Sequence, residues 1–275
     1  MRRVDAVIAV VAVAFAAFVI RAVLHTQRAL APPVEPVADV PRSGARDTPS
    51  NEIVVEASGP PPPRRDIPAI LRVLQHRAEG TYVDELLAAR DSGIARWADR
   101  RSNPVRVWID ERPSLPGFDP ILPAEVRRAF DAWSVAGVPL VYTYVTDSTG
   151  SEVRVTFVDR FDGRMSGRTL WERDPSWWIV GGKVELALRS GTGQLLTPPQ
   201  FYAIALHEVG HVLGLDHTAD TTAVMASRVR VLALSDRDIA TMRLIYELPP
   251  GKVSGAGVAT ASPASLSASR PREQR

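Results

Sequence analysis

Three histidines and a glutamate stand close together at residues 207–217, where the chain reads H-E-V-G-H-V-L-G-L-D-H. On a helix, His207 and His211 project from one face, as two ligands of one metal must. Gly214 allows the backbone to leave the helix through a left-handed turn and to bring His217 back as a third ligand. Three neutral imidazoles leave a fourth tetrahedral position open for water, which is typical of a catalytic zinc ion rather than a structural one.

The residues before and within this string predict the helix that the ligands need. Thr197 provides an N-cap, Pro198 occupies the first helical position, and Gln200 stands at the capping-box position. The apolar positions that follow are Ala203, Ile204, Leu206, Val209, Val212 and Leu213. A single pair of histidines spaced four residues apart is common and by itself does not indicate a metal site. Five fixed positions, however, match by chance in on the order of one in a hundred thousand such chains.

The string resembles the metzincin metalloproteases, whose signature is H-E-x-x-H-x-x-G-x-x-H. Thr218 follows the third histidine, and Met225 lies in a segment similar to the Met-turn of the matrixins. Residues 234–246 resemble the C-terminal matrixin helix. The resemblance covers residues 104–248 and implies an α+β metzincin domain, with a mixed twisted sheet and three helices. The active-site helix would carry the zinc-binding string.

Hydrophobic patterns predict the same α+β order of elements. Strands are expected at residues 105–109, 140–145, 152–158, 167–171 and 179–188. Helices are expected at residues 123–135, over the zinc-binding string, and from residue 235 onwards. These elements would form one catalytic domain.

The resemblance implies an exported zinc-dependent endopeptidase that hydrolyses extended polypeptides. The metal ligands would be His207, His211 and His217. Glu208 would be the general base that takes a proton from a zinc-activated water. Residues 167–171 would form the edge strand that pairs with the substrate. Two alternatives stay open: a zinc-stabilised binding module without turnover, and a zinc amidase that acts on cell-wall peptides.

The metal content is expected to differ from that of most matrixins. Matrixins commonly bind a second, structural zinc through histidines in the loop before the edge strand, but residues 161–170 contain no histidine. We therefore expect one zinc ion. Asp159, Asp162 and Asp174 carry the oxygen atoms that calcium prefers. Scattered loop aspartates are usually solvated or cap turns, so calcium has no support from the sequence.

The control of activity is also expected to differ. The chain contains no cysteine, which excludes disulfides, thiolate ligands and the cysteine that blocks the zinc in many matrix metalloproteinase propeptides. The acidic pair of the last matrixin helix is reduced to Arg237-Asp238, which argues against activation by a newly freed N-terminus. Residues 67–101 are expected to be a helical extension packed on the domain or stalk. The alternative is a pro-segment across the cleft, with His76 or Asp84 near the metal.

Segments of different composition flank the predicted domain. Arg2 and Arg3 precede an apolar run, so residues 1–30 are expected to be a signal peptide or a membrane anchor. The expected order after that is a Pro-rich disordered linker at 31–66, the helical extension at 67–101, the matrixin-like metalloprotease domain at 102–248 and a disordered tail at 249–275. The protein would be extracytoplasmic, either anchored to the membrane or secreted after cleavage.

The composition limits the partners. Hydrophobic residues make up 45% of the chain, enough for a core, and the formal net charge is only +2. Arginine pairs are scattered rather than gathered in a basic stripe, which indicates solvated surface and no nucleic-acid partner. Polypeptide substrates are the expected partners, together with N-terminal membrane association, and the sequence leaves the oligomeric state open.

Overall fold

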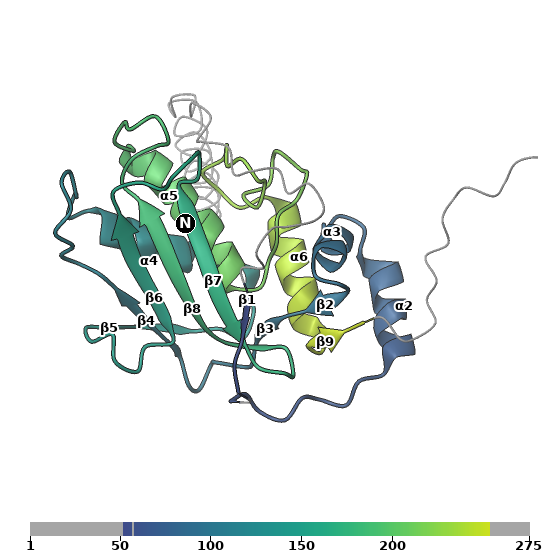
Figure 1. The fold of residues 1–275 in the computed structure, drawn as a ribbon. Coiled ribbons are helices and arrows are strands. Elements are labelled where there is room, and N and C mark those ends of the chain that lie inside the picture. The colour runs from purple at the N-terminus through teal and green to yellow at the C-terminus, as the bar shows by residue number, and fades with distance from the viewer. Residues whose placement is uncertain (1–51, 57, 254–275) are drawn as a thin grey trace, which may run out of the picture.

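A mixed sheet of seven strands runs through residues 52–56 and 58–253, the part of the chain that this computed structural model describes (Figure 1). The strand order is β1-β7-β8-β6-β4-β5, and β3 pairs with β8 outside this path. Within this sheet, only β7 and β8 pair antiparallel, and the other pairs are parallel. The strands are β1 Glu52–Val54, β3 Arg96–Trp97, β4 Val105–Ile109, β5 Tyr142–Val145, β6 Val153–Val158, β7 Gly167–Arg173 and β8 Trp178–Ala187.

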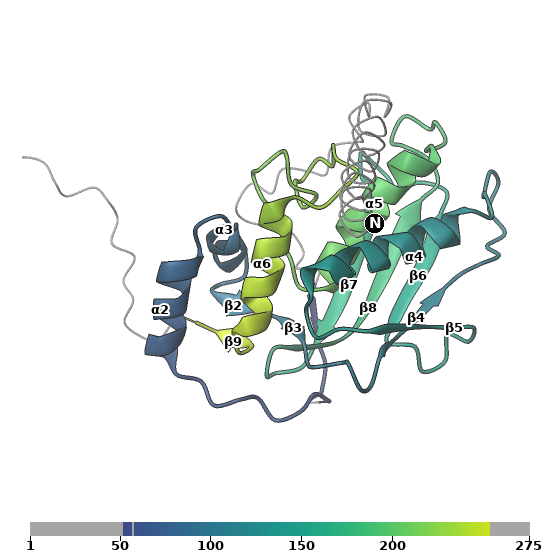
Figure 2. The same cartoon turned by 180° about the vertical axis from the view of Figure 1, so that it is seen from behind.

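Three helices occur in the predicted domain, as the sequence led us to expect: α4 (Leu122–Trp133), α5 (Pro198–Val212) and α6 (Asp236–Glu247). A short 3-10 turn, η1 (Ser134–Ala136), follows α4. Figure 2 shows α4 and α5 against one face of the sheet, while α6 stands beside it. The α+β metzincin-like fold is therefore confirmed. Two further helices, α2 (Ile67–Arg77) and α3 (Val83–Ala89), precede the domain.

Local sequence explains where α5 and α6 begin. Thr197 and Gln200 form the predicted capping box at the start of α5, where the main-chain N–H of Thr197 donates to the Gln200 side chain over 3.0 Å. Ser235 and Asp238 form a second capping box at α6. These side chains satisfy N–H groups that a helix leaves unpaired in its first turn. Every residue of α5 from Phe201 to Val212 is buried, because the helix packs against α4 and against strands β7 and β8.

The prediction that residues 31–66 form a disordered linker is wrong for residues 52–56 and 58–66. Strand β1 pairs with the end of β7, and the N–H of Gly59 donates to Asp174 Oδ2 over 3.2 Å. The indole N–H of Trp178 donates to Pro60 O over 2.8 Å. The segment is poor in apolar side chains, but its backbone groups find partners at the sheet edge, which composition alone does not reveal.

The prediction of a disordered tail at residues 249–275 does not hold at residues 251–252, and residues 254–275 lie outside the described residues. Strand β9 (Gly251–Lys252) pairs antiparallel with β2 (Gly93–Ile94) in a small second sheet. The predicted N-terminal segment at residues 1–30 lies outside the described residues. Within the described part of the chain, no helix is long and apolar enough to cross a membrane.

The helical extension packs into the hydrophobic core of the domain. Leu86 and Trp97 are almost fully buried in the same cluster as α5, and the Trp97 indole donates to Val212 O over 2.9 Å. His76 and Asp84 are exposed on α2 and α3. Neither belongs to the one cluster of potential metal ligands found among the described residues. The structure therefore gives no support to a pro-segment that approaches the metal.

Replacing Leu86 with alanine tests whether the extension is part of the folded unit. Leu86 is 0% exposed, so Leu86→Ala should lower the free energy of unfolding by about 2–5 kcal/mol. Leu87→Ala, at a half-buried position on the same helix, should cost much less. Chemical denaturation of the two variants measures the difference. Equal stabilities would mean that the extension does not share the core.

Candidate metal centre

Three imidazole rings converge at the end of α5. The Nε2 atoms of His207, His211 and His217 lie 3.1–3.2 Å from one another. A zinc ion with Zn–N distances of about 2.0–2.1 Å and tetrahedral angles requires nitrogen atoms about 3.3 Å apart. The spacing therefore fits one zinc ion bound by three nitrogen ligands.

Main-chain carbonyl groups orient two of these rings. His207 Nδ1 lies 2.7 Å from Val224 O, and His211 Nδ1 lies 3.0 Å from Leu215 O. A carbonyl oxygen can only accept, so each Nδ1 carries the proton and donates it. The lone pair is then left on Nε2, the atom that faces the other rings. This is the tautomer that a metal ligand needs.

The surroundings keep the histidines neutral. Burial lowers the pKa of His207 and His211 well below the usual histidine value, and the neighbouring imidazoles lower it further. Burial also lowers the pKa of His217, although the Asp216 carboxylate opposes this shift. Because a metal displaces a proton from a charged imidazole, a low pKa favours metal binding at neutral pH.

Glu208 follows His207 on α5, and its carboxylate lies against strand β7. The Thr169 hydroxyl lies 2.7 Å from Glu208 Oε2 and 3.1 Å from the main-chain oxygen of Glu208. A Cβ atom at Gly167 would come within 2.4 Å of Glu208 Oε1, so only glycine leaves room for the carboxylate there. Burial raises the pKa of Glu208 to about 7, and the Thr169 hydrogen bond opposes the rise. A carboxyl group with this pKa can take up and release a proton near neutral pH.

The Met-turn lies under the two histidines of α5. Met225 is fully buried, and a Cβ atom at Gly210 would lie 2.3 Å from its sulfur. Asp238 is also fully buried, and it accepts hydrogen bonds from the N–H of Val224 over 2.9 Å and from the Tyr82 hydroxyl over 3.0 Å. Since Val224 O orients His207, Asp238 supports the site through one intervening residue. In the sequence, Asp238 is the remaining member of the acidic pair of the last helix and is not predicted as a support of the metal centre.

The edge-strand prediction needs a correction. Strand β7 forms as expected, but β1 covers part of its outer edge, pairing with Trp171 and Arg173. In the described part of the chain, residues 167–170 have no strand partner on that side. Two of these residues, Gly167 and Thr169, lie against Glu208. The free edge next to the rings is therefore shorter than predicted.

The loop aspartates considered for calcium have structural partners. Asp159 Oδ1 pairs with Arg189 Nε over 3.0 Å. Asp174 accepts hydrogen bonds from the main-chain N–H groups of Ser176 and Trp178 over 2.8 and 3.0 Å. These two carboxylates serve an ion pair and a turn, so calcium gains no support from them.

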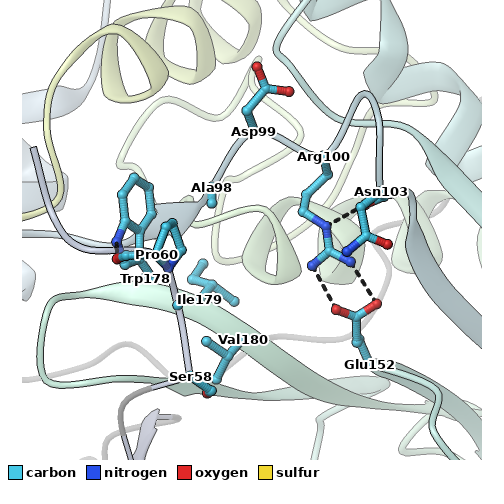
Figure 3. Close-up of a pocket in the computed structure, with 11 residues that line it drawn as sticks. Ser58, Pro60, Ala98, Asp99, Arg100, Asn103, Glu152, Trp178, Ile179 and Val180 are labelled. Carbon is cyan, nitrogen blue, oxygen red and sulfur yellow. Dashed lines mark hydrogen bonds and ion pairs between the residues drawn. The ribbon is translucent and has the colours of Figure 1, made fainter.

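A surface pocket lies away from the three histidine rings, next to residues 58–60. Figure 3 shows Ser58, Pro60 and Trp178 on one side of it and the Arg100–Glu152 ion pair on the other. The two bonds of this ion pair are 2.6 and 2.9 Å long. None of the three histidines lines the pocket. We therefore place the candidate site at the rings and not in this pocket.

Fold and site together define a metzincin-like domain, and sequence comparisons agree. The sequence model of the family "Peptidase_M10: Matrixin" matches residues 160–247. "Metalloendoproteinase 1" of Glycine max is 25% identical over 156 residues, covering 49% of this chain and 48% of the relative. "Hatching enzyme" of Paracentrotus lividus is 31% identical over 158 residues, covering 50% and 24%. "Neutrophil collagenase" of Homo sapiens is 28% identical over 156 residues, covering 51% and 32%.

The chain is thus matrixin-like and resembles metalloproteases over about half of its length. It spans half or less of the length of the curated relatives that it matches. The family match begins after the helical extension.

Zinc should stabilise the folded protein through the three histidines. A free zinc concentration about 100-fold above the dissociation constant should add about 2.7 kcal/mol to the free energy of unfolding. His211→Ala should abolish this gain, because only two of the three histidine ligands would remain. His76→Ala, which removes an exposed histidine from α2, should leave it unchanged. Thermal unfolding with and without zinc measures the gain, and equal gains in both variants would contradict the assignment.

Proposed function

We propose that the protein is an exported zinc-dependent endopeptidase with one catalytic zinc ion. The observation that carries the proposal is the convergence of three neutral imidazoles next to a buried carboxyl group, Glu208. The rings would hold the metal through Nε2. The matrixin match supports the reaction class, since one relative is named a metalloendoproteinase and another a collagenase.

Glu208 would act as the general base and then as the general acid. Zinc, when bound, lowers the pKa of water and polarises a carbonyl group. Glu208 would take the proton of the attacking water and deliver it to the departing amine. Thr169 would hold the Glu208 carboxylate through its hydroxyl, 2.7 Å from Oε2. The glycine at position 167 would leave space for the carboxylate between the helix and the strand.

The substrate would bind as an extended strand along the free edge of β7. Outward-facing N–H and C=O groups of an edge strand can pair with any peptide, so binding needs no particular sequence. Residues 167–170 would provide this edge, and β1 would limit its length at Trp171. The substrate would therefore meet the strand where Glu208 is in contact with it.

The catalytic unit would include the helical extension. Trp97 and Leu86 share the core of the domain, and β3 belongs to its main sheet. Arg237 donates to Thr81 O over 2.6 Å and pairs with Asp220 over 2.8 Å. These bonds connect α6 to the extension. We propose that the extension stays in place in the active protein and that export depends on residues 1–30.

Glu208→Gln tests the general base without changing the size of the side chain. Peptide hydrolysis should fall by about 100- to 10,000-fold, while zinc binding persists, because the amide cannot accept a proton. Glu125→Gln, at a half-buried glutamate of α4, is the matched control and should keep full activity. Activity is measured on a mixed peptide library, with and without a chelator.

The same assay separates the alternatives. Zinc binding without hydrolysis of any peptide would favour a binding module, and hydrolysis of cell-wall peptides alone would favour an amidase. Hydrolysis that survives Glu208→Gln would contradict the mechanism.

Proline substitutions at the last residue of β1 and at the residue after it test whether this strand limits the substrate edge. The Val55 N–H donates to Arg173 O over 2.9 Å, and Val55→Pro removes it. In a parallel pair the N–H of the adjacent residue points away from the partner strand, so Val54→Pro is the matched control. Val55→Pro should lower KM for long peptides several-fold and leave short peptides unaffected. Equal effects of the two substitutions would contradict this role of β1.

A further inference from the structure

Arg90 is a nearly buried arginine at the end of helix α3, outside both the zinc-binding string and the family match. Its side chain is 6% exposed. The residue caps the C-terminal end of α3, so the helical extension fixes its position. Long charged side chains are rarely buried unless their donors have partners. The partners of Arg90 therefore indicate what the residue does.

The side-chain hydrogen bonds of Arg90 go to the loop that connects the second histidine to the third. Nη1 donates to Gly214 O over 2.7 Å, and Nη2 donates to Leu215 O over 2.8 Å. Nε donates to Asp216 Oδ2 over 3.1 Å. The guanidinium carbon also lies 4.9 Å from the centre of the Trp171 ring on β7. One side chain thus contacts three consecutive residues of the loop.

Two of these contacts lead directly to histidines of the site. Leu215 O accepts from Arg90 and also from His211 Nδ1, over 3.0 Å. Asp216 accepts from Arg90 with Oδ2, and its Oδ1 accepts from the His217 main-chain N–H over 2.7 Å. Arg90 therefore reaches the site through one intervening residue in each case. Leu215 connects it to the ring of His211, and Asp216 connects it to the backbone of His217.

The loop needs such support because the backbone turns sharply there. Gly214 has φ +102°, and a Cβ atom at this position would lie 2.4 Å from Ala95 O. The loop leaves the C-terminal end of α5, where carbonyl groups have no partner within the helix. A guanidinium group offers five donors in a fixed plane, so it can hold several acceptors at once, which a lysine cannot do.

We propose that Arg90 is a positioning residue for the metal centre. Its side chain holds the 214–216 loop, so that His217 stays in place and zinc is retained. The proposal rests on the proposed zinc site. It assigns a role in metal retention to the helical extension, which would have to remain attached for the site to hold zinc.

Arg96 provides a matched control. Its guanidinium lies 4.8 Å from the Trp178 ring centre, Nε donates to Leu248 O over 2.8 Å, and Nη1 donates to Trp97 O over 3.0 Å. Arg96 thus resembles Arg90 in its aromatic contact and its carbonyl acceptors. None of these contacts reaches the 214–217 segment. Removing Arg96 should cost general stability without a direct effect on the metal.

The experiment compares zinc release from the full-length chain and from the variants Arg90→Met, Arg90→Lys and Arg96→Met. Zinc transfer to a chromogenic chelator gives the rate of loss, and the visible spectrum of the cobalt-substituted protein reports the ligand geometry. Losing an outer partner of a metal ligand typically costs about 10- to 100-fold in affinity. We expect Arg90→Met to release zinc at least about tenfold faster than the parent and to change the cobalt spectrum. Arg96→Met should resemble the parent.

Arg90→Lys keeps the charge and is included in case Arg90→Met does not fold. It should release zinc at an intermediate rate, since one ammonium group cannot hold all three acceptors. Equal release rates for the parent and both Arg90 variants would overturn the proposal, as would equal effects of Arg90→Met and Arg96→Met. A parent that binds zinc but cleaves no peptide would overturn the proposed function alone. A parent that binds no zinc would overturn both.

Discussion

The structure depends on bringing three neutral imidazole nitrogens to within 3.1–3.2 Å of one another. Lone pairs at that spacing repel unless a cation lies between them, so the protein must hold each ring by other means. Carbonyl groups of Val224 and Leu215 hold His207 and His211, and the Asp216 carboxylate holds the backbone of His217. Burial then lowers the histidine pKa values, which keeps the lone pairs free.

Elements from the whole described chain supply these supports. Helix α6 provides Asp238, which holds the Met-turn. Strand β7 provides the glycine and the threonine that receive the Glu208 carboxylate. Helix α3 ends at Arg90, whose guanidinium binds the loop between His211 and His217. The site is therefore a property of the packed domain and not of the zinc-binding helix alone, which agrees with the burial of α5 from Phe201 to Val212.

The sequence predicted the elements whose signals are local. Capping residues mark the starts of α5 and α6, and apolar and polar residues alternate along β4 and β6. Each of these signals lies within a few residues of the element that it specifies, so the α+β fold could be predicted from them. The pairing of β1 with β7 and the bonds of Arg90 connect residues more than a hundred positions apart. Such contacts leave no periodic pattern. The proline-rich composition before residue 67 predicted disorder because few of its side chains can be buried in a core. Composition does not indicate whether the backbone groups of a segment will find hydrogen-bond partners.

X-ray absorption at the zinc edge of the purified full-length protein measures the ligands of the metal. We expect one zinc per chain, with three imidazole nitrogens at about 2.0–2.1 Å and one oxygen ligand. Replacing the histidines at 207, 211 and 217 should abolish this spectrum. A second zinc of equal occupancy, or a zinc ion with fewer than three imidazole ligands, would contradict this expectation.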